Sequence, residues 1–229
     1  VMDLGSGDGR IPIEAVRRYG ARAGIGIDID EKLVRLANAN AAAAGVGDRV
    51  RFVRGDLFET DLSGASLVTV YLLPNMVTRL VPKMLAEMPA GARVVAHDYP
   101  LAPWRHDRVV TFELEEKIAI SGSARTVLYH YTVPARIAGT WRLEPPRGTA
   151  QQPILLSIEQ RDARTTAAAT TAGRTATLED FAVQGETVRF TLRSADGVAR
   201  VLEGRVRGEI IEGTAPAPWR ATRTAPGKG

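Results

Sequence analysis

Short apolar runs alternate with helical periodicity over the first part of the chain. The runs have strand length, and between them apolar residues recur every three or four positions. The predicted strands are residues 1–4, 23–28, 50–53, 67–72 and 93–96, and the predicted helices are 11–19, 31–44 and 81–88. This alternation favours βαβ units, and therefore an α/β fold with a mostly parallel sheet.

The rhythm changes after the fifth predicted strand. Val109–Leu114 and Thr126–Val133 are both β-like, and a turn around Gly122 joins them. Two consecutive strands with a turn between them predict an antiparallel hairpin. The parallel sheet is therefore expected to end in such a hairpin, with residues 1–136 forming the first domain.

From Gly139 onward no helical period is present. The predicted strands are 154–160, 187–192, 200–206 and 209–212, separated by the turn pairs Ala172-Gly173, Gln184-Gly185, Asp196-Gly197 and Arg207-Gly208. Short strands at this spacing predict a small barrel or sandwich over residues 137–224, followed by a polar tail at 225–229. Trp104 and Trp141 are expected to pack between the two domains.

A glycine-rich segment follows the first predicted strand and opens the first helix. It runs Asp3-Leu4-Gly5-Ser6-Gly7-Asp8-Gly9-Arg10. Its glycines allow a ligand to approach the backbone closely, next to the free N–H groups of a helix N-terminus. A dinucleotide-binding motif would carry its third glycine where Arg10 stands. The carboxylate before the first glycine suits a cofactor with a positive amino group rather than a pyrophosphate.

Two further acids follow the second and third predicted strands. Asp28 lies 19 residues after Gly9, where a carboxylate can accept hydrogen bonds from ribose hydroxyls. Asp56, followed by Leu57, comes just after the third strand and can meet an adenine amino group. Successive parallel strands end at one edge of the sheet, so the three acids are expected to converge there. Asp28 could instead cap the next helix, and Asp56 could be a turn residue.

The motifs resemble those of the class I, seven-strand, S-adenosylmethionine-dependent methyltransferases over residues 1–136. More narrowly, Asp3–Ile11 (DLGSGDGRI) and Val70–Met76 (VYLLPNM) resemble one family. It contains the lysine methyltransferases of the mitochondrial ATP synthase c subunit and adenine nucleotide translocase, with prokaryotic relatives.

The resemblance implies a Rossmann-like sheet and S-adenosylmethionine as cofactor. It places Asp3 near the methionine amino group, Asp28 on the ribose and Asp56 by the adenine. The glycines implied to contact the cofactor are Gly5, Gly7 and Gly9. The chain departs from the usual pattern at 99–107, which is too short and proline-rich for a crossover helix.

The catalytic residues stay open. Tyr71, Pro74 and Asn75 follow the fourth predicted strand, where methyltransferases present substrate, but core packing followed by a turn explains this segment equally well. His97 and Asp98, which end the fifth strand, are weaker candidates. Pro82 is expected in the first turn of its helix, where proline is tolerated.

Composition excludes several other chemistries. The chain has no cysteine and only three scattered histidines, so thiolate catalysis and a zinc site are not expected. A formal net charge of +4 is spread over both halves without a basic cluster, which argues against nucleic-acid binding. No apolar run reaches membrane-spanning length. We expect a cytoplasmic protein, although a signal segment preceding Val1 is not excluded.

The predicted function is methyl transfer from S-adenosylmethionine to an acceptor. The resemblance implies a protein lysine amine. The alternatives are a small-molecule methyltransferase and a non-catalytic nucleotide- or ligand-binding protein. The oligomeric state and the role of the β domain stay open.

Overall fold

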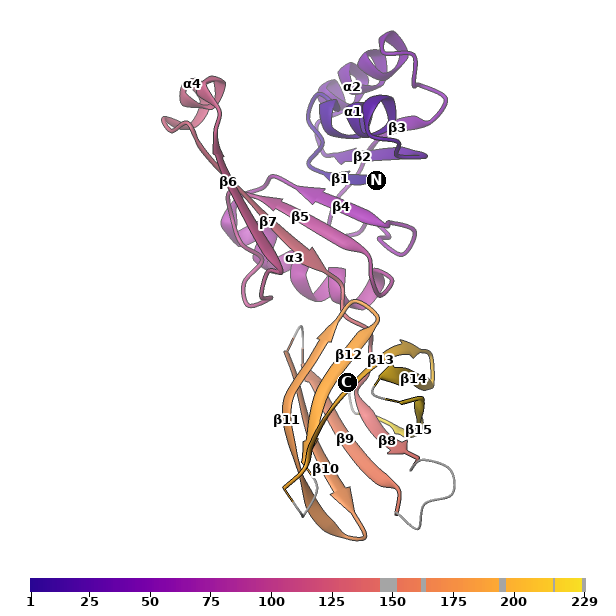
Figure 1. Cartoon of the computed structure of the whole chain (residues 1–229). Helices are drawn as coiled ribbons and strands as arrows, with labels where there is room; N and C mark the ends of the chain where they lie inside the picture. Colours follow the sequence, from indigo (N-terminus) through magenta and orange to yellow (C-terminus); the bar gives the residue numbers. More distant parts are fainter. Residues whose placement is uncertain (145–151, 162–163, 194–196, 216, 228–229) are drawn as a thin grey trace. The chain divides into compact units, whose positions relative to one another are not determined.

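The computed structural model describes residues 1–144, 152–161, 164–193, 197–215 and 217–227. The turn pair at Asp196 lies partly outside these residues. The chain divides into two compact units, Val1–Val133 and Pro134–Gly229. The first contains a mixed sheet with helices and the second a closed barrel (Figure 1). Each unit is described below by itself.

The first unit is built on a seven-stranded sheet in the order β3-β2-β1-β4-β5-β7-β6. Its strands are β1 (Met2–Leu4), β2 (Gly24–Asp28), β3 (Val50–Arg54), β4 (Leu67–Val70), β5 (Arg93–His97), β6 (Arg108–Glu113) and β7 (Arg125–Thr132). β1 to β5 pair in parallel, whereas β7 is antiparallel to both β5 and β6. The predicted Rossmann-like sheet with a terminal antiparallel hairpin is confirmed.

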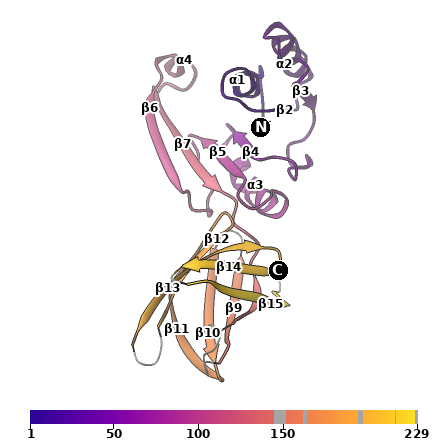
Figure 2. The same cartoon turned by 45° about the vertical axis from the view of Figure 1, so that its right-hand side comes forward.

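The helices pack their apolar stripes against the sheet. They are α1 (Arg10–Arg18), α2 (Glu31–Ala43) and α3 (Pro74–Glu87). Around α1, α2 and β3 the buried cluster consists of Ile13, Val16, Val34, Ala37, Ala41, Val46, Val50 and Phe52. A 3-10 turn, η1 (Glu115–Lys117), and a single helical turn, α4 (Ile118–Ser121), connect β6 to β7 at the outer end of the hairpin (Figure 2). None of the helices in the described residues is long and apolar enough to span a membrane.

The third helix begins earlier than the sequence pattern predicted. α3 starts at Pro74, so Pro82 lies inside the helix and its expected place in the first turn was wrong. Proline suits the first helical position because its φ is already helical and that position needs no N–H donor. The buried residues Val77, Leu80, Val81 and Met84 show that the apolar stripe starts before Pro82.

The second unit is an eight-stranded antiparallel barrel, which confirms the barrel form of the predicted β domain. The strands are β8 (Gly139–Leu143), β9 (Ile154–Arg161), β10 (Arg164–Thr171), β11 (Arg174–Gln184), β12 (Thr187–Arg193), β13 (Ala199–Arg207), β14 (Ile210–Ala215) and β15 (Trp219–Pro226). Each strand pairs with the next in the chain, and β15 closes on β8. The sequence did not predict β8, β10, β11 and β15. Of these, β10 is rich in Ala and Thr, so it lacks large apolar residues at alternate positions.

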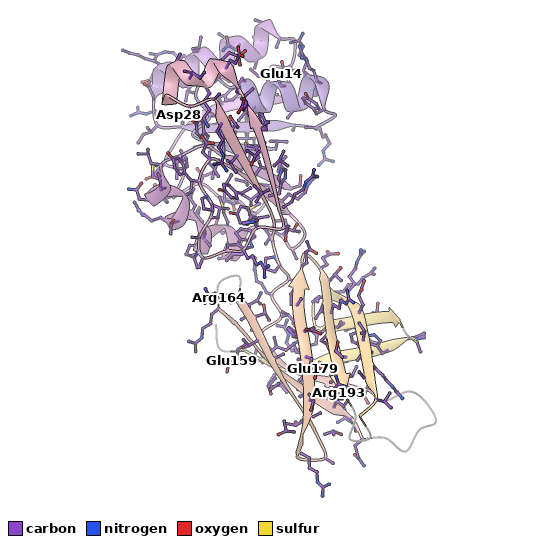
Figure 3. The ribbon with its side chains drawn as sticks, turned by 60° about the vertical axis from the view of Figure 1, so that its left-hand side comes forward. Glu14, Asp28, Glu159, Arg164, Glu179 and Arg193 are labelled. Atoms are coloured by element: carbon purple, nitrogen blue, oxygen red, sulfur yellow. The ribbon has the colours of Figure 1, made fainter. Side chains whose placement is uncertain are left out.

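The barrel interior is apolar. Its largest fully buried side chains include Trp141 and Phe190. The Trp141 indole N–H donates to the Ile137 carbonyl at 2.8 Å, and the Arg223 guanidinium lies 4.7 Å from the ring. The expectation that Trp141 packs between the two domains was therefore wrong. Charged pairs such as Glu179 with Arg193, 2.9 Å apart, lie on the exposed surface of neighbouring strands (Figure 3).

Two neighbouring leucines on β9 differ in burial, so substituting each of them separates the effect of burial on stability from the effect of strand propensity. Leu156 is fully buried and Leu155 is 41% exposed. We expect Leu156→Ala to lower the free energy of unfolding by about 2–5 kcal/mol, because it removes buried methyl groups and leaves a cavity. Leu155→Ala, the matched control, should cost less than about 1 kcal/mol. Urea unfolding followed by circular dichroism measures both, and equal losses would contradict the assigned strand faces.

Candidate functional site

The loop between β1 and α1 is fastened to the end of β2. The N–H groups of Gly5 and Ser6 both donate to the Ile27 carbonyl, at 2.8 and 3.0 Å. Gly5, Gly7 and Gly9 have φ values of 78°, 53° and 82°, a backbone region that favours glycine. The motif therefore forms a tight, left-handed loop whose last glycine caps α1.

Gly9 and Gly7 have different surroundings. A Cβ on Gly9 would lie 2.5 Å from Phe52 Cζ and 2.9 Å from Ala37 Cβ, so Gly9 is required by packing within the protein. A Cβ on Gly7 would meet no atom of the described residues within 4 Å. Next to Gly7, the Ser6 hydroxyl oxygen is buried without a hydrogen-bond partner in the described part of the chain. The loop thus combines open space at Gly7 with an unused polar atom, as a ligand site would.

Asp28 joins this loop to α2. Its Oδ2 accepts from the Gly7 N–H at 2.8 Å, and its Oδ1 accepts from the Asp30 N–H at 3.0 Å. Asp30 is the residue that caps α2, since its side chain accepts from the Lys32 N–H at 2.7 Å. Each carboxylate oxygen has two lone pairs, so Asp28 keeps capacity for a ligand hydroxyl. Asp28, labelled in Figure 3, is the last residue of β2.

Asp56 lies on the adjacent turn. The Gly55 N–H donates to the Asp28 carbonyl at 3.0 Å, which holds the turn after β3 beside the end of β2. The exposed Asp56 carboxylate accepts from the Phe58 N–H at 2.8 Å, so it already serves as a turn residue, and Leu57 next to it is half-buried. Asp28 and Asp56 therefore follow neighbouring strands at one edge of the sheet, as the sequence predicted.

Asp3 has a different environment. It is only 3% exposed, and its Oδ1 accepts from the Thr69 hydroxyl at 2.5 Å. Burial raises the pKa of Asp3 to about 7; the Thr69 hydrogen bond opposes this rise, and the charges of Asp28 and Asp8 add to it. A neighbouring cation would favour the ionised form.

The segment after β4 lies against the glycine loop. Leu72 Cδ2 would be 2.6 Å from a Cβ on Gly5, so this leucine packs directly on the loop backbone. Tyr71 is 43% exposed, and its ring centroid lies 3.9 Å from that of His97 at the end of β5. Pro74 and Asn75 are exposed in the first turn of α3. The sheet thus brings Tyr71 and Leu72 to the predicted cofactor edge, followed by Pro74 and Asn75 on the helix.

A cavity of about 1090 Å³ lies along the sheet, between the starts of β1, β4 and β5 and the turn after β3. Its lining includes Ile25, Val53 and Asp56 but not Gly5, Gly7 or Tyr71. Since the loop and acceptor candidates lie outside it, the cavity does not define the site.

Comparisons with known proteins agree with this arrangement. Residues 3–108 match the family profile described as the ANTKMT methyltransferase domain. A protein-lysine N-methyltransferase of Saccharolobus islandicus (strain REY15A) is 35% identical over 133 residues, covering 58% of this chain and 78% of that protein. The mouse adenine nucleotide translocase lysine N-methyltransferase is 40% identical over 110 residues, 48% of each chain. The chain thus spans about half the length of the mouse relative.

A solved structure is also similar. It is the structure of an RNA methyltransferase from Salinibacter ruber in complex with S-adenosyl-L-homocysteine. It is 45% identical, covers 59% of this chain and 81% of that one, and has a TM-score of 0.52. S-adenosylhomocysteine is what S-adenosylmethionine becomes after losing its methyl group.

The sheet order and these matches define a class I methyltransferase that uses S-adenosylmethionine. Within that class, the chain belongs to the family of the ANTKMT methyltransferase domain and of the Saccharolobus protein-lysine enzyme.

The buried Asp3 predicts a pH dependence of stability. Its pKa is raised to about 7 from 3.8, so the folded protein binds this proton more tightly than the unfolded chain. The resulting stabilisation is complete below about pH 4 and is lost as pH rises towards 7, by at most about 4 kcal/mol. Asp3→Asn, which is uncharged, should remove this decline. Chemical denaturation of both proteins at pH 4 to 8 measures it, and parallel curves would contradict the raised pKa.

Proposed function

We propose that this protein transfers a methyl group from S-adenosylmethionine to a protein lysine amine. The observation that carries the proposal is the contact between the segment after β4 and the glycine loop, through Leu72 and Gly5. It puts an apolar and aromatic segment next to the loop that we assign to the cofactor. The names of the related lysine methyltransferases support the same acceptor.

The cofactor-binding residues are proposed from the same edge of the sheet. Gly7 offers the open space, Asp28 would accept from ribose hydroxyls, and the turn at Asp56 and Leu57 would meet the adenine. Gly5 and Gly9 shape the loop. Asp3 lies in β1 just before the loop, and its buried carboxyl would favour a cationic amino group of the ligand. We assign these roles to residues 1–136 and leave the barrel outside cofactor binding.

The protein itself does not have to activate the methyl group. When bound, the cofactor supplies a methyl group that its sulfonium already activates. The protein then has to align the acceptor with that methyl group and exclude water. A lysine amine has a reference pKa of about 10.4 and must lose its proton before it can attack. Surroundings such as Tyr71, Leu72 and Leu73 disfavour the charged form and so favour the reactive amine.

RNA is a second candidate acceptor, because the similar Salinibacter protein is described as an RNA methyltransferase. The charge pattern opposes it. In the first domain acidic and basic residues nearly balance, and no basic cluster with interleaved aromatic residues is present in the sequence.

Gly7→Val tests the cofactor assignment. The side chain would enter the space at Gly7 and should abolish binding of S-adenosylmethionine, measured by calorimetry. Gly20→Val is the matched control: Gly20 also has a positive φ and no neighbour within 4 Å, but it follows the far end of α1. Both substitutions carry similar backbone strain, so only the loss at Gly7 reports on the ligand. Unchanged affinity in folded Gly7→Val would remove the loop from the site.

Labelling of a cell extract tests the acceptor. The enzyme and S-adenosylmethionine with a labelled methyl group are incubated with the extract, and protein, RNA and small metabolites are separated. We expect label on lysine, identified by mass spectrometry of the hydrolysed protein. Label confined to RNA or metabolites, or absent from lysine, would overturn the proposal while leaving the methyltransferase class intact.

The rate should also rise with pH between about 7 and 9, because the neutral amine becomes more abundant. A rate independent of pH over this range, measured with saturating cofactor, would contradict a lysine amine as the acceptor.

A further inference from the structure

Gly5, Tyr71 and His97 lie at the ends of three neighbouring strands. In the sheet Leu4 of β1 pairs with Val70 of β4, which pairs with Ala96 of β5. Gly5 and Tyr71 directly follow β1 and β4, and His97 is the last residue of β5, so all three come from neighbouring strand ends at the carboxyl edge. The tyrosine and histidine rings are tilted by 39° with their centroids 3.9 Å apart.

The backbone behind His97 is firmly held. Asp98 has a φ of 62°, which is costly for a residue with a side chain and persists only where the surroundings enforce it. Its N–H donates to the Val127 carbonyl at 2.7 Å, and its Oδ1 accepts from the Val127 N–H at 3.1 Å. Its Oδ2 lies 2.6 Å from the ammonium of Lys117, a residue only 8% exposed. These contacts fix Asp98 to β7 and η1.

The contact that the structure shows for the imidazole of His97 is with the Tyr71 ring. Its Nε2 is buried and has no hydrogen-bond partner among the described residues, and it lies 3.7 Å from Asp98 Oδ1, beyond hydrogen-bond distance. Burial lowers the pKa of His97; the Asp98 carboxylate opposes this and the Lys117 ammonium adds to it. The half-buried imidazole offers its neighbour Tyr71 an aromatic surface.

We propose that His97 is a positioning residue for the methyl acceptor, which acts by holding the Tyr71 ring at the carboxyl edge of the sheet. The inference rests on the proposed function, because it takes Tyr71 as a wall of the acceptor site. The ring is 43% exposed, and an aromatic face can pack against the alkyl part of the acceptor side chain while keeping water away. Without the stack, the ring can turn about its side-chain bonds and lose that orientation.

The stack itself can be measured without any acceptor. The imidazole of His97 is titrated by NMR, and its signal is assigned by its loss in His97→Phe. In Tyr71→Ala the imidazole becomes more exposed, so its pKa should rise towards the ordinary value. Tyr71→Phe, which keeps the ring, should leave it unchanged. An unchanged pKa in Tyr71→Ala would show that the ring does not cover His97.

Kinetics test the positioning role. We expect His97→Ala to lower kcat/KM for the labelled acceptor by about tenfold, the upper range for a stacked aromatic pair, with unchanged affinity for S-adenosylmethionine. His97→Phe should restore kcat/KM to within about threefold of the wild-type value, because it keeps a ring at this position. If His97→Ala fails to fold by circular dichroism, His97→Leu replaces it, since it fills the volume without a ring.

The outcomes separate the alternatives. If His97→Phe is as slow as His97→Ala, the imidazole nitrogens are needed and the positioning role is wrong. Wild-type rates in both would also overturn it. If the wild-type enzyme labels RNA instead of lysine, the proposed function fails, and the same variants are then judged with RNA as acceptor.

Discussion

The carbonyl of Ile27 accepts two N–H groups of the glycine loop, and the Asp28 carboxylate that follows it accepts a third from Gly7. These bonds can form only because the loop turns back with three positive φ values, which glycine allows at little steric cost. They fasten the start of α1 to the end of β2. The positions of the loop, of α1 and of the neighbouring acids all depend on this attachment.

The acids at this edge are not equivalent. Asp28 has both oxygens engaged by backbone N–H groups, whereas the Asp3 carboxyl is buried beside a single hydroxyl. Burial opposes ionisation, and it raises the pKa of Asp3. One edge therefore combines a carboxylate held by two backbone N–H groups near the open space at Gly7 with a carboxyl that takes its proton more readily. Such a pair suits a ligand that presents both hydroxyls and a positive charge.

The barrel is stabilised independently of this edge. Its closed ladder leaves no strand edge among β8 to β15, and its core consists of residues from the barrel alone. The Trp219 ring lies so close to Gly213 and Gly204 that a side chain at either position would collide with it. In the first unit, by contrast, Asp98 and Lys117 fasten the β6–β7 hairpin to the end of β5.

Local patterns in the sequence were enough to predict the alternating elements, the order of the three acids and the terminal hairpin. Periodicity and glycine spacing are local properties, and parallel strands necessarily end at a common edge.

The helix at Pro74 was missed because a Pro-Asn pair after a strand also fits a turn. Four barrel strands, β8, β10, β11 and β15, were also missed, and β10 among them has few large side chains that could mark a buried face. Only the tertiary structure showed that Gly7 faces open space while Gly9 packs on Phe52, that Trp141 belongs to the barrel core, and that His97 stacks on Tyr71. Those facts depend on contacts between residues far apart in the chain, which no single stretch of sequence contains.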